Sequence, residues 1–453
     1  MQSPIRTEIK ESLHLTIPLA SAQVAQAATG FVDTVMMGWL GQETLAGGGI
    51  AATTFTTLLV IATGIVIGVS PLIAEAYGAG NKARIQQLTR QGIWLTLILT
   101  IPGMLLLGQV NSLMQFGLAE NIVMLAKTFL NIMLWGFLPA LMLAMLKSVV
   151  SSLSQPRPIT LIVVIGTLFN AIGNYILGFG KLGFPALGIQ GIAWASVMSN
   201  WLMLMLLIAY ICQHKQLKIY NLFAQFDWID LKILRELIWL GVPIAISFAF
   251  EIGLFTTTTY LMGILGTDIL AAHQIVFQTI AVIFMIPLGM SFATTIRVGQ
   301  WMGQQNAEGV RLSAYVSMWM GGLFMTVMAI TLLLFPRLVI SLYLDIDNPA
   351  NKGAIALATS MLNIAAISQI LDGVQTTAAG ALRGLQDTRV PMLLSFLAFW
   401  GIGLTCGYLL GFHLGFGGVG LWLGQLIGVS VAAGLFVWRF QRLMSSLRMD
   451  IVP

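Results

Sequence analysis

Three carboxylates stand inside long apolar stretches of the sequence. Asp33, Glu251 and Asp372 are surrounded by hydrophobic and small residues, whereas the other acids among the 17 Asp and Glu fall in or near polar segments. In a stretch of bilayer length, an ionised carboxylate costs roughly 2.5–3.5 kcal/mol on insertion scales. Such side chains must face protein, water or a cation. Cation binding is therefore the chemistry that we expect of them.

The composition excludes a soluble globular protein. Of the 453 residues, 57% are hydrophobic and 9% are charged, against a usual charged fraction of roughly 25%. The apolar runs are about 20 residues or longer, which is the length of a membrane-spanning helix. The net charge of +5 is scattered rather than gathered on one face, so no nucleic-acid partner is expected. Cys212 and Cys406 are too far apart in the sequence to imply a disulfide framework or a metal cluster.

We expect an all-α integral membrane protein with twelve transmembrane helices. Eighteen of the 22 Lys and Arg residues lie on the side of the N-terminus, which places both termini in the cytoplasm by the positive-inside rule. No Lys or Arg is expected deep in a span. The expected spans are 14–38, 44–73, 91–114, 122–147, 158–178, 188–212, 235–262, 268–296, 313–336, 353–381, 390–412 and 417–440.

An internal repeat divides the chain into two six-helix lobes. One shift superposes Pro18 on Pro243 and Asn81 on Asn306, and a second, slightly longer shift superposes Tyr175 on Tyr408. Because six is even, both lobes enter the membrane in the same sense, and a pseudo-two-fold axis along the membrane normal relates them. The expected domains are an N-terminal lobe, a cytoplasmic linker and a C-terminal lobe, at 1–212, 213–231 and 232–453.

The acids are distributed unequally between the lobes. Glu251 and Asp372 belong to the first and fourth helices of the C-terminal lobe, and if they meet, the pair would attract a proton or Na⁺. In the repeat, Glu251 superposes on Gln26. In the N-terminal lobe, Asp33 can form an oxygen-rich cation or proton site with three polar residues, which can instead tie helices together by hydrogen bonds. These three residues are Asn170, Asn174 and Ser196.

Other side chains suit a substrate cavity or helix packing. Aromatic rings and a soft thioether can stack on flat organic cations, although packing against lipid or core is the alternative for each of them. His273 fits a structural histidine better than a proton carrier. The glycine runs Gly64-xxx-Gly68, Gly403-xxx-Gly407-xxx-Gly411 and Gly420-xxx-Gly424-xxx-Gly428 predict close helix packing. The cavity candidates are Phe250, Phe255, Phe277, Phe284, Trp135, Trp194, Met290 and Gln26.

Several segments carry a resemblance to a known family over nearly the whole chain. They are Gly30-Phe31-Val32-Asp33-Thr34 with Met37-Gly38, Phe250-Glu251 with Leu254-Phe255, Ala271-Ala272-His273-Gln274, Ile296-Arg297-Val298-Gly299, and Asp372 followed by Ala379-Gly380-Ala381-Leu382-Arg383-Gly384. In this order they resemble the MATE family, multidrug and toxic compound extrusion, and its NorM-type bacterial branch. The resemblance implies a V-shaped antiporter that expels cationic amphiphilic drugs or toxins in exchange for Na⁺ or H⁺.

The family's pattern also implies roles for single residues. Glu251 and Asp372 would bind the coupling cation in the C-terminal lobe, tentatively Na⁺, and Asp33 would serve the N-terminal lobe. Ser368 stands where some NorM proteins carry a tyrosine. The coordination of the ion, and the choice between Na⁺ and H⁺, are therefore left open by the resemblance.

We therefore expect a multi-pass transporter of a bacterial inner membrane that acts as a monomer and needs no cofactor besides its coupling ion. No P-loop or common hydrolase motif occurs, so the chain is not expected to be an enzyme. A lipid-intermediate flippase of similar architecture and a passive channel are the alternatives. The flippase would need a more cationic central cavity, and the channel would need a continuous polar path.

Overall fold

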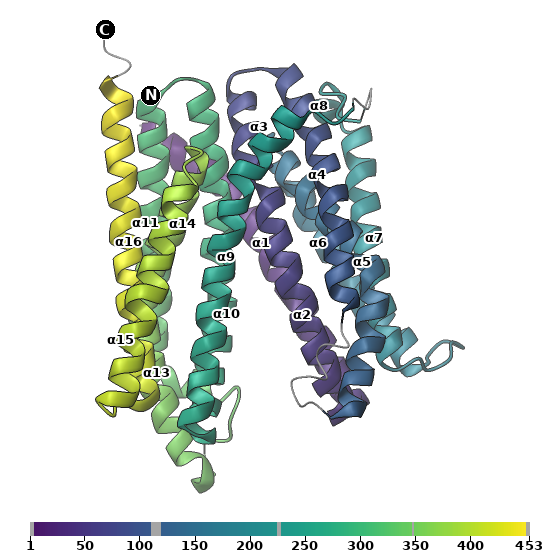
Figure 1. The fold of residues 1–453 in the computed structure, drawn as a ribbon, viewed down its shortest axis with the longest axis vertical. Helices are drawn as coiled ribbons and strands as arrows, with labels where there is room; N and C mark the ends of the chain where they lie inside the picture. Colours follow the sequence, from purple (N-terminus) through teal and green to yellow (C-terminus); the bar gives the residue numbers. More distant parts are fainter. Residues whose placement is uncertain (1–3, 110–118, 224–227, 347, 450–453) are drawn as a thin grey trace. The chain divides into compact units, whose positions relative to one another are not determined.

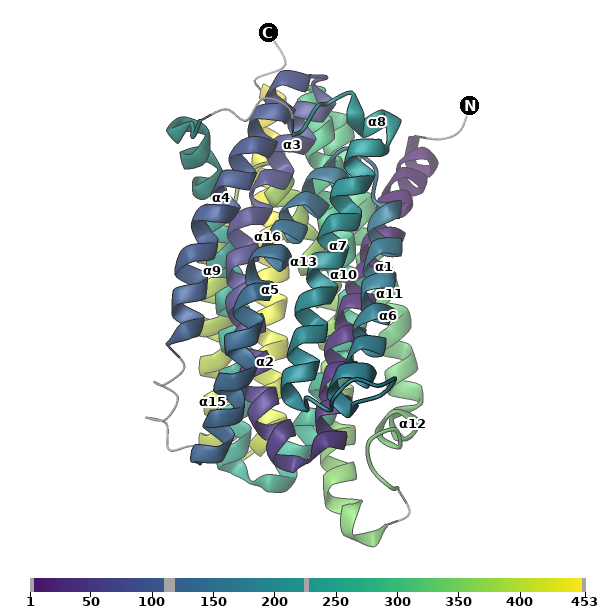
Figure 2. The same cartoon turned by 90° about the vertical axis from the view of Figure 1, so that its right-hand side faces the viewer.

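The protein is built from helices. The computed structural model describes residues 4–109, 119–223, 228–346 and 348–449, and every regular element within these ranges is helical (Figures 1 and 2). The expected all-α fold is confirmed. The long α-helices are α1 (Pro4–Leu40), α2 (Gln42–Ile67), α4 (Lys82–Gly108), α5 (Glu120–Ser152), α6 (Arg157–Gly173), α7 (Ile189–Gln213), α9 (Leu231–Leu265), α10 (Thr267–Gly303), α11 (Ala307–Leu334), α13 (Lys352–Gly384) and α16 (Gly417–Met449).

Shorter elements extend or connect these helices. The run 389–413 contains α14 (Arg389–Ser395), a π-helical stretch Phe396–Leu404, α15 (Thr405–Tyr408) and a second π-helical stretch Leu409–His413. A π-helical turn, Asn174–Gly178, continues α6. The remaining elements are α3 (Val69–Gly78), α8 (Lys215–Lys218), α12 (Pro336–Ile340) and a 3₁₀ turn, Pro349–Asn351.

The expected spans agree with these helices. Within the described residues, eleven helical runs are long and apolar enough to cross a membrane. The expected first span, 14–38, lies in α1, which is not one of the eleven because Gln23, Gln26 and Asp33 make it more polar. The end of the expected span 91–114, residues 110–114, lies outside the described residues.

The chain folds into two compact units that differ from the expected lobes. The first unit is Ser21–Ala245, and the second unit is Met1–Ala20 together with Ile246–Pro453. The start of α1 therefore belongs to the second unit, and the start of α9 belongs to the first. The expected boundaries at 212 and 232 stay a prediction about the sequence repeat. Part of the expected linker, residues 224–227, lies outside the described residues.

The sequence repeat is visible in the backbone. Gly41 and Gly266 precede α2 and α10 with φ of 130° and 138°, a conformation that residues with a Cβ rarely adopt. Asn81 and Asn306 cap α4 and α11 in the same way, each accepting a hydrogen bond from the backbone N–H three residues further on, at 3.0 and 2.9 Å. Both pairs stand in the register that superposes Pro18 on Pro243.

The glycine runs pack helices closely, as predicted. A Cβ built on Gly424 of α16 would lie 2.2 Å from Cα of Gly407 in α15. The neighbouring pairs Gly411 with Gly420 and Gly403 with Gly428 approach in the same way. In the first unit, Gly64 of α2 lies against Ala245 of α9. Small residues at these crossings let the backbones come together without a hydrophobic driving force.

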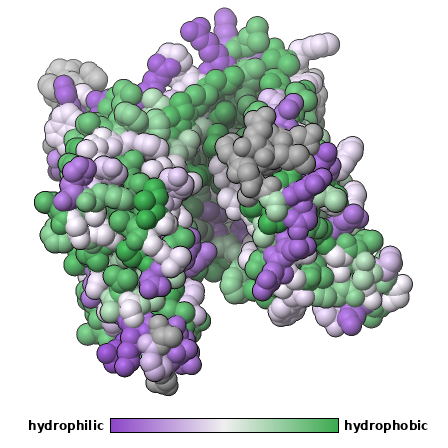
Figure 3. Space-filling model, turned by 60° about the horizontal axis from the view of Figure 1, so that its bottom comes forward, coloured by the Kyte–Doolittle hydropathy of each residue, from purple (hydrophilic) through white to green (hydrophobic). Residues whose placement is uncertain are grey.

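Apolar side chains also cover much of the outside. Figure 3 shows hydrophobic residues over a large part of the visible surface. Trp39, Leu105, Trp319 and Leu338 are among the exposed large hydrophobic side chains. Such a surface suits contact with lipid rather than water.

Candidate functional site

The first unit brings together Asp33 and its three expected polar neighbours. Asn174 Nδ2 donates to Asp33 Oδ1 at 2.6 Å, and Ser196 Oγ donates to Asp33 Oδ2 at 3.1 Å. Asn170 Nδ2 donates to Ser196 Oγ at 3.0 Å, and Asn174 Nδ2 also reaches Asn170 Oδ1 at 3.2 Å. The four side chains form one connected polar cluster between α1, α6 and α7.

Local helix geometry positions this cluster. Asn170 lies in α6, and Asn174 opens the π-helical turn that follows, so the two amides lie one turn apart. Both are fully buried, and Ser196 is nearly so. Asn174 Oδ1 has no hydrogen-bond partner among the described residues. A carboxylate with amide and hydroxyl oxygens is a donor set that suits a hard cation. The hydrogen bonds equally suit a tie between helices, so both interpretations of the cluster remain.

The second unit brings Glu251 and Asp372 to one cavity. Glu251 projects from α9, and Ser368 and Asp372 project from α13, into a partly open cavity of about 30 Å³. The two carboxylates are close enough to interact electrostatically. A cavity needs roughly 10–15 Å³ to hold one water molecule. The space therefore suits a small cation with few water molecules, and it could not hold an organic drug.

Among the residues that line the same cavity and that we did not single out from the sequence, three carry polar side-chain atoms. Gln369 precedes Asp372 by three residues on α13, a spacing that puts both on one helix face and could have revealed it. Its buried Oε1 has no hydrogen-bond partner among the described residues. Gln425 and Trp422 come from α16, and nothing in the sequence pattern connects them to Glu251. Gln425 Nε2 donates to Thr258 Oγ1 at 3.2 Å.

Lys147 and Arg383 lie near the ends of their helices and are partly or fully withdrawn from solvent, while the expectation that no basic residue lies deep in a span stays a prediction. Lys147 was expected at the end of its span, but α5 continues to Ser152. Its Nζ donates to Gln26 Oε1 at 3.1 Å. Arg383 lies in the last turn of α13, yet it is buried, because its guanidinium folds back to donate to Ser291 Oγ of α10 at 2.5 Å. Arg383 also interacts electrostatically with Glu251.

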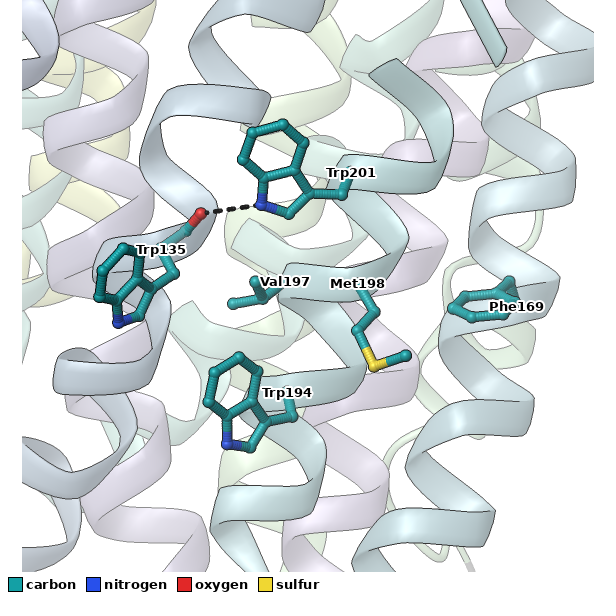
Figure 4. A pocket seen from close by; sticks show the side chains of 6 residues that line it. All are labelled: Trp135, Phe169, Trp194, Val197, Met198 and Trp201. Carbon is teal, nitrogen blue, oxygen red and sulfur yellow. Dashed lines mark hydrogen bonds between the residues drawn. The ribbon is translucent and has the colours of Figure 1, made fainter. Parts of the chain in front are cut away.

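The aromatic candidates lie in several places. Trp135 of α5 and Trp194 of α7 line a pocket of about 560 Å³ in the first unit (Figure 4). The other residues that line it are Phe169, Val197, Met198 and Trp201. Figure 4 shows the indole of Trp201 directed at the backbone of Trp135, to whose carbonyl it donates a hydrogen bond at 3.2 Å.

The remaining candidates belong to the second unit, apart from Gln26. Phe255 lines the small cavity and packs against Phe277, with ring centroids 5.3 Å apart. Phe250 packs against Phe396 at 5.1 Å. Phe284 packs against a hydrophobic core cluster, and Met290 is buried. The common substrate cavity of these residues stays a prediction.

His273 has the surroundings of a structural histidine. It is fully buried, and its Nε2 lies 2.9 Å from Thr259 Oγ1. Its ring centroid lies 5.9 Å from that of Phe277 and 5.6 Å from that of Trp422. These contacts favour the structural interpretation over that of a proton carrier.

Comparison with known proteins agrees with the repeat and the motifs. The model of the MatE family matches the chain twice, at residues 18–176 and 243–409. The matches start at the repeated pair Pro18 and Pro243 and end just after the repeated pair Tyr175 and Tyr408, as the two registers predict. A solved structure described as an outward-facing conformation of a multidrug resistance MATE family transporter of the MOP superfamily has a TM-score of 0.87 at 20% identity, covering 97% of this chain and 96% of that chain. It shows that the fold is shared.

Two bacterial relatives align over nearly their whole length. A protein of Synechocystis sp. named "Probable multidrug resistance protein NorM" is 51% identical over 445 residues, which are 98% of this chain and 96% of that protein. A protein of Synechococcus sp. with the same name is 48% identical over 440 residues, 97% of this chain and 95% of that protein. The resemblance is therefore confirmed, and the chain belongs to the NorM-type bacterial branch of the MatE family, whose members are membrane transporters and not enzymes.

Proposed function

We propose that the protein is a secondary active exporter that moves cationic amphiphilic drugs or toxins out of the cell in exchange for a cation. Its relatives are named multidrug resistance proteins, which supports export of several small molecules. The observation that carries the exchange is the small cavity where Glu251 and Asp372 meet. Two carboxylates in an apolar bundle are costly when both are ionised, and a bound cation offsets that cost.

The cavity can couple cation movement to drug movement through two conformations. If the cation binds better to the conformation that releases drug outward, drug binding must favour cation release by the same factor. Inward movement of one positive charge supplies about 2.3 kcal/mol per 100 mV of membrane potential. This is enough to drive a modest drug gradient uphill.

We favour Na⁺ as the coupling ion, with H⁺ as the alternative. Ser368, Gln369 and Gln425 add neutral oxygens around the carboxylates, and Na⁺ needs such oxygens to complete its coordination. A proton would need only the two carboxylates. Proteoliposomes with Na⁺ and H⁺ gradients imposed one at a time, and with the cationic dye ethidium as substrate, would decide between them.

Two substitutions test the exchange mechanism. Glu251→Gln and Asp372→Asn keep size and hydrogen bonding but remove the charge, so uphill dye movement should be lost under either gradient while both proteins still insert. Glu120→Gln, which changes an exposed acid at the start of α5, is the matched control and should transport normally. Full exchange in both cavity variants would rule this mechanism out.

A lipid-intermediate flippase is the second candidate, and the observation that favours it is the half-buried Lys147, whose ammonium donates to the neutral Gln26. An ammonium of this kind is a ligand for the pyrophosphate of a lipid intermediate. A flipping assay with a fluorescent lipid diphosphate separates the two functions. The exporter should move ethidium uphill and leave that lipid in place.

We also propose that the protein acts as a monomer in a bacterial inner membrane, with both termini in the cytoplasm. The distribution of Lys and Arg supports this orientation.

A further inference from the structure

The start of α9 reaches beyond the hydrocarbon core of a bilayer. Its 35 residues measure about 52 Å at the helical rise of about 1.5 Å per residue, against a core of about 30 Å. Its charged residues other than Glu251 gather in the first turns, at Lys232, Arg235 and Glu236. This polar start is therefore the end that projects into the headgroup region. The distribution of Lys and Arg assigns it to the cytoplasmic side.

Two basic side chains at this start are free of protein partners within the described residues. Lys232 and Arg235 are exposed, and their side-chain nitrogens make no hydrogen bond or ion pair there. The neighbouring acids are already used. Glu236 pairs with Arg84 of α4. Asp230 caps the helix, accepting from the backbone N–H of Lys232 at 2.8 Å. Two positive charges one turn apart are thus left for a negative group from outside the chain.

Exposed apolar side chains surround these two charges. Trp228 is 93% exposed and Leu231 is 75% exposed. Ile238 and Trp239, two turns after Leu231 on the same face of the helix, are exposed as well. Tryptophan at the end of a span lies at headgroup level, where one side of the ring contacts lipid and the other meets water. Basic and apolar groups at this level suit a phospholipid, which offers a phosphate and acyl chains together.

The fold holds Trp228 in this exposed position. Gln91, buried in α4, donates from Nε2 to the carbonyl of Trp228 at 3.0 Å, and its Oε1 accepts from the backbone N–H of Asp230 at 3.1 Å. On the inner face of the next turns, Leu234 and Leu237 are buried in the hydrophobic core of the first unit. A ligand that binds here does not have to order the segment first.

We propose that Trp228, Leu231, Lys232 and Arg235 form a docking surface, the α9 surface, for an anionic phospholipid of the cytoplasmic leaflet. Lys232 and Arg235 bind the phosphate, the guanidinium through two parallel N–H groups. Trp228 and Leu231 lie against the start of the acyl chains. A lipid without net charge is bound less well, because its own cation competes for the phosphate. The α9 surface is separate from the cavity at Glu251, and its occupation does not require cation exchange.

Quenching by spin-labelled lipids tests the α9 surface. A Cys212→Ser, Cys406→Ser, Ile229→Cys chain carries a bimane fluorophore beside Trp228, at a position that is itself exposed. The full chain is placed in nanodiscs of phosphatidylcholine that contain doxyl-labelled phosphatidylglycerol or, at the same mole fraction, doxyl-labelled phosphatidylcholine. The ratio of the two association constants measures the preference for anionic lipid. We expect a ratio of about 25, since each Lys or Arg near the surface contributes about fivefold.

Four variants of this labelled chain assign the preference to the two basic residues. Arg235→Gln should lower the ratio about fivefold, and Lys232→Gln combined with Arg235→Gln should bring it close to one. Arg235→Lys keeps the charge and should retain most of the preference. Lys10→Gln removes an exposed basic residue from the start of α1 and is the matched control, which should leave the ratio unchanged.

Three outcomes would overturn the proposal. One is equal quenching by both lipids in the labelled parent, which would show an interface without selectivity. Another is a preference that survives in the Lys232→Gln, Arg235→Gln chain. The third is loss of the preference when inorganic phosphate is added, compared with sodium chloride of equal ionic strength, because the site would then bind a free anion. The measurement needs neither an ion gradient nor a drug, so its result is independent of the test of export.

Discussion

At the scale of single residues, Pro139 explains the contact of Trp201. Proline has no backbone N–H, so the carbonyl four residues earlier in α5, that of Trp135, loses its helical partner. The indole of Trp201 in α7 supplies the missing donor at 3.2 Å. In a membrane such a carbonyl cannot turn to water. The tryptophan thereby restores a hydrogen bond that the proline removes.

A double-mutant cycle tests this relation. Trp201→Phe keeps a ring but removes the N–H, and it should lower the free energy of unfolding by about 1–3 kcal/mol because the carbonyl is left without a donor. In a Pro139→Ala chain the backbone N–H returns, so the same substitution should cost less. Thermal unfolding in detergent of the parent chain, the two single variants and the double variant gives the cost of Trp201→Phe with and without Pro139. Equal costs in the two backgrounds would contradict the pairing.

Asp33 is the residue for which two interpretations remain, and one substitution separates them. Asp33→Asn should abolish uphill ethidium movement in proteoliposomes if the cluster binds the coupling cation, because the charge is gone. If Asp33 only ties helices together, exchange should persist and the free energy of unfolding should fall by about 1–3 kcal/mol. We expect the loss of transport. Measuring transport and thermal unfolding on one preparation distinguishes the outcomes.

At the scale of elements, the contact between α15 and α16 depends on glycine. A methyl group on Gly424 would overlap the backbone at Gly407, so Gly424→Ala should force the helices apart and cost about 1–3 kcal/mol of stability. Gly434 lies on the same helix with nothing within 4 Å of an added Cβ. Gly434→Ala should leave the melting temperature unchanged or raise it slightly. Similar losses of stability in Gly424→Ala and Gly434→Ala would show that helix propensity, and not the packing of α15 against α16, determines the effect of these substitutions.

The elements also show what the sequence could and could not reveal. Long apolar runs predict helices because a membrane admits little else, and the repeat predicts equivalent caps. The π-helical turn at Asn174 leaves no mark in the hydropathy pattern. The helix that was expected to end at Lys147 continues to Ser152, because hydropathy cannot locate a helix end to within a few residues. Gln425 reaches the cation cavity from α16, and only the tertiary fold brings it there.

At the scale of the whole molecule, two helices take part in both compact units. α1 passes from the second unit to the first after Ala20, and α9 passes from the first to the second after Ala245. The two crossing points are equivalent positions of the repeat, since each comes two residues after a repeated proline, Pro18 or Pro243. Each compact unit therefore contains one half of α1 and one half of α9, so the two units do not simply follow one another along the chain.

The orientation of the whole molecule can be read from its own cysteines. Cys212 is exposed at the end of α7, on the side assigned to the cytoplasm, and Cys406 lies within the run 389–413. In a Cys406→Ser chain, a membrane-impermeant maleimide should label Cys212 in inverted vesicles and not in intact spheroplasts. A Cys212→Ser, Cys406→Ser, Lys181→Cys chain should show the opposite, because Lys181 lies in an exposed loop on the other side. Labelling of Cys212 in intact spheroplasts would show that the topology is opposite to the one expected. The proposed direction of cation-driven transport would then be reversed as well.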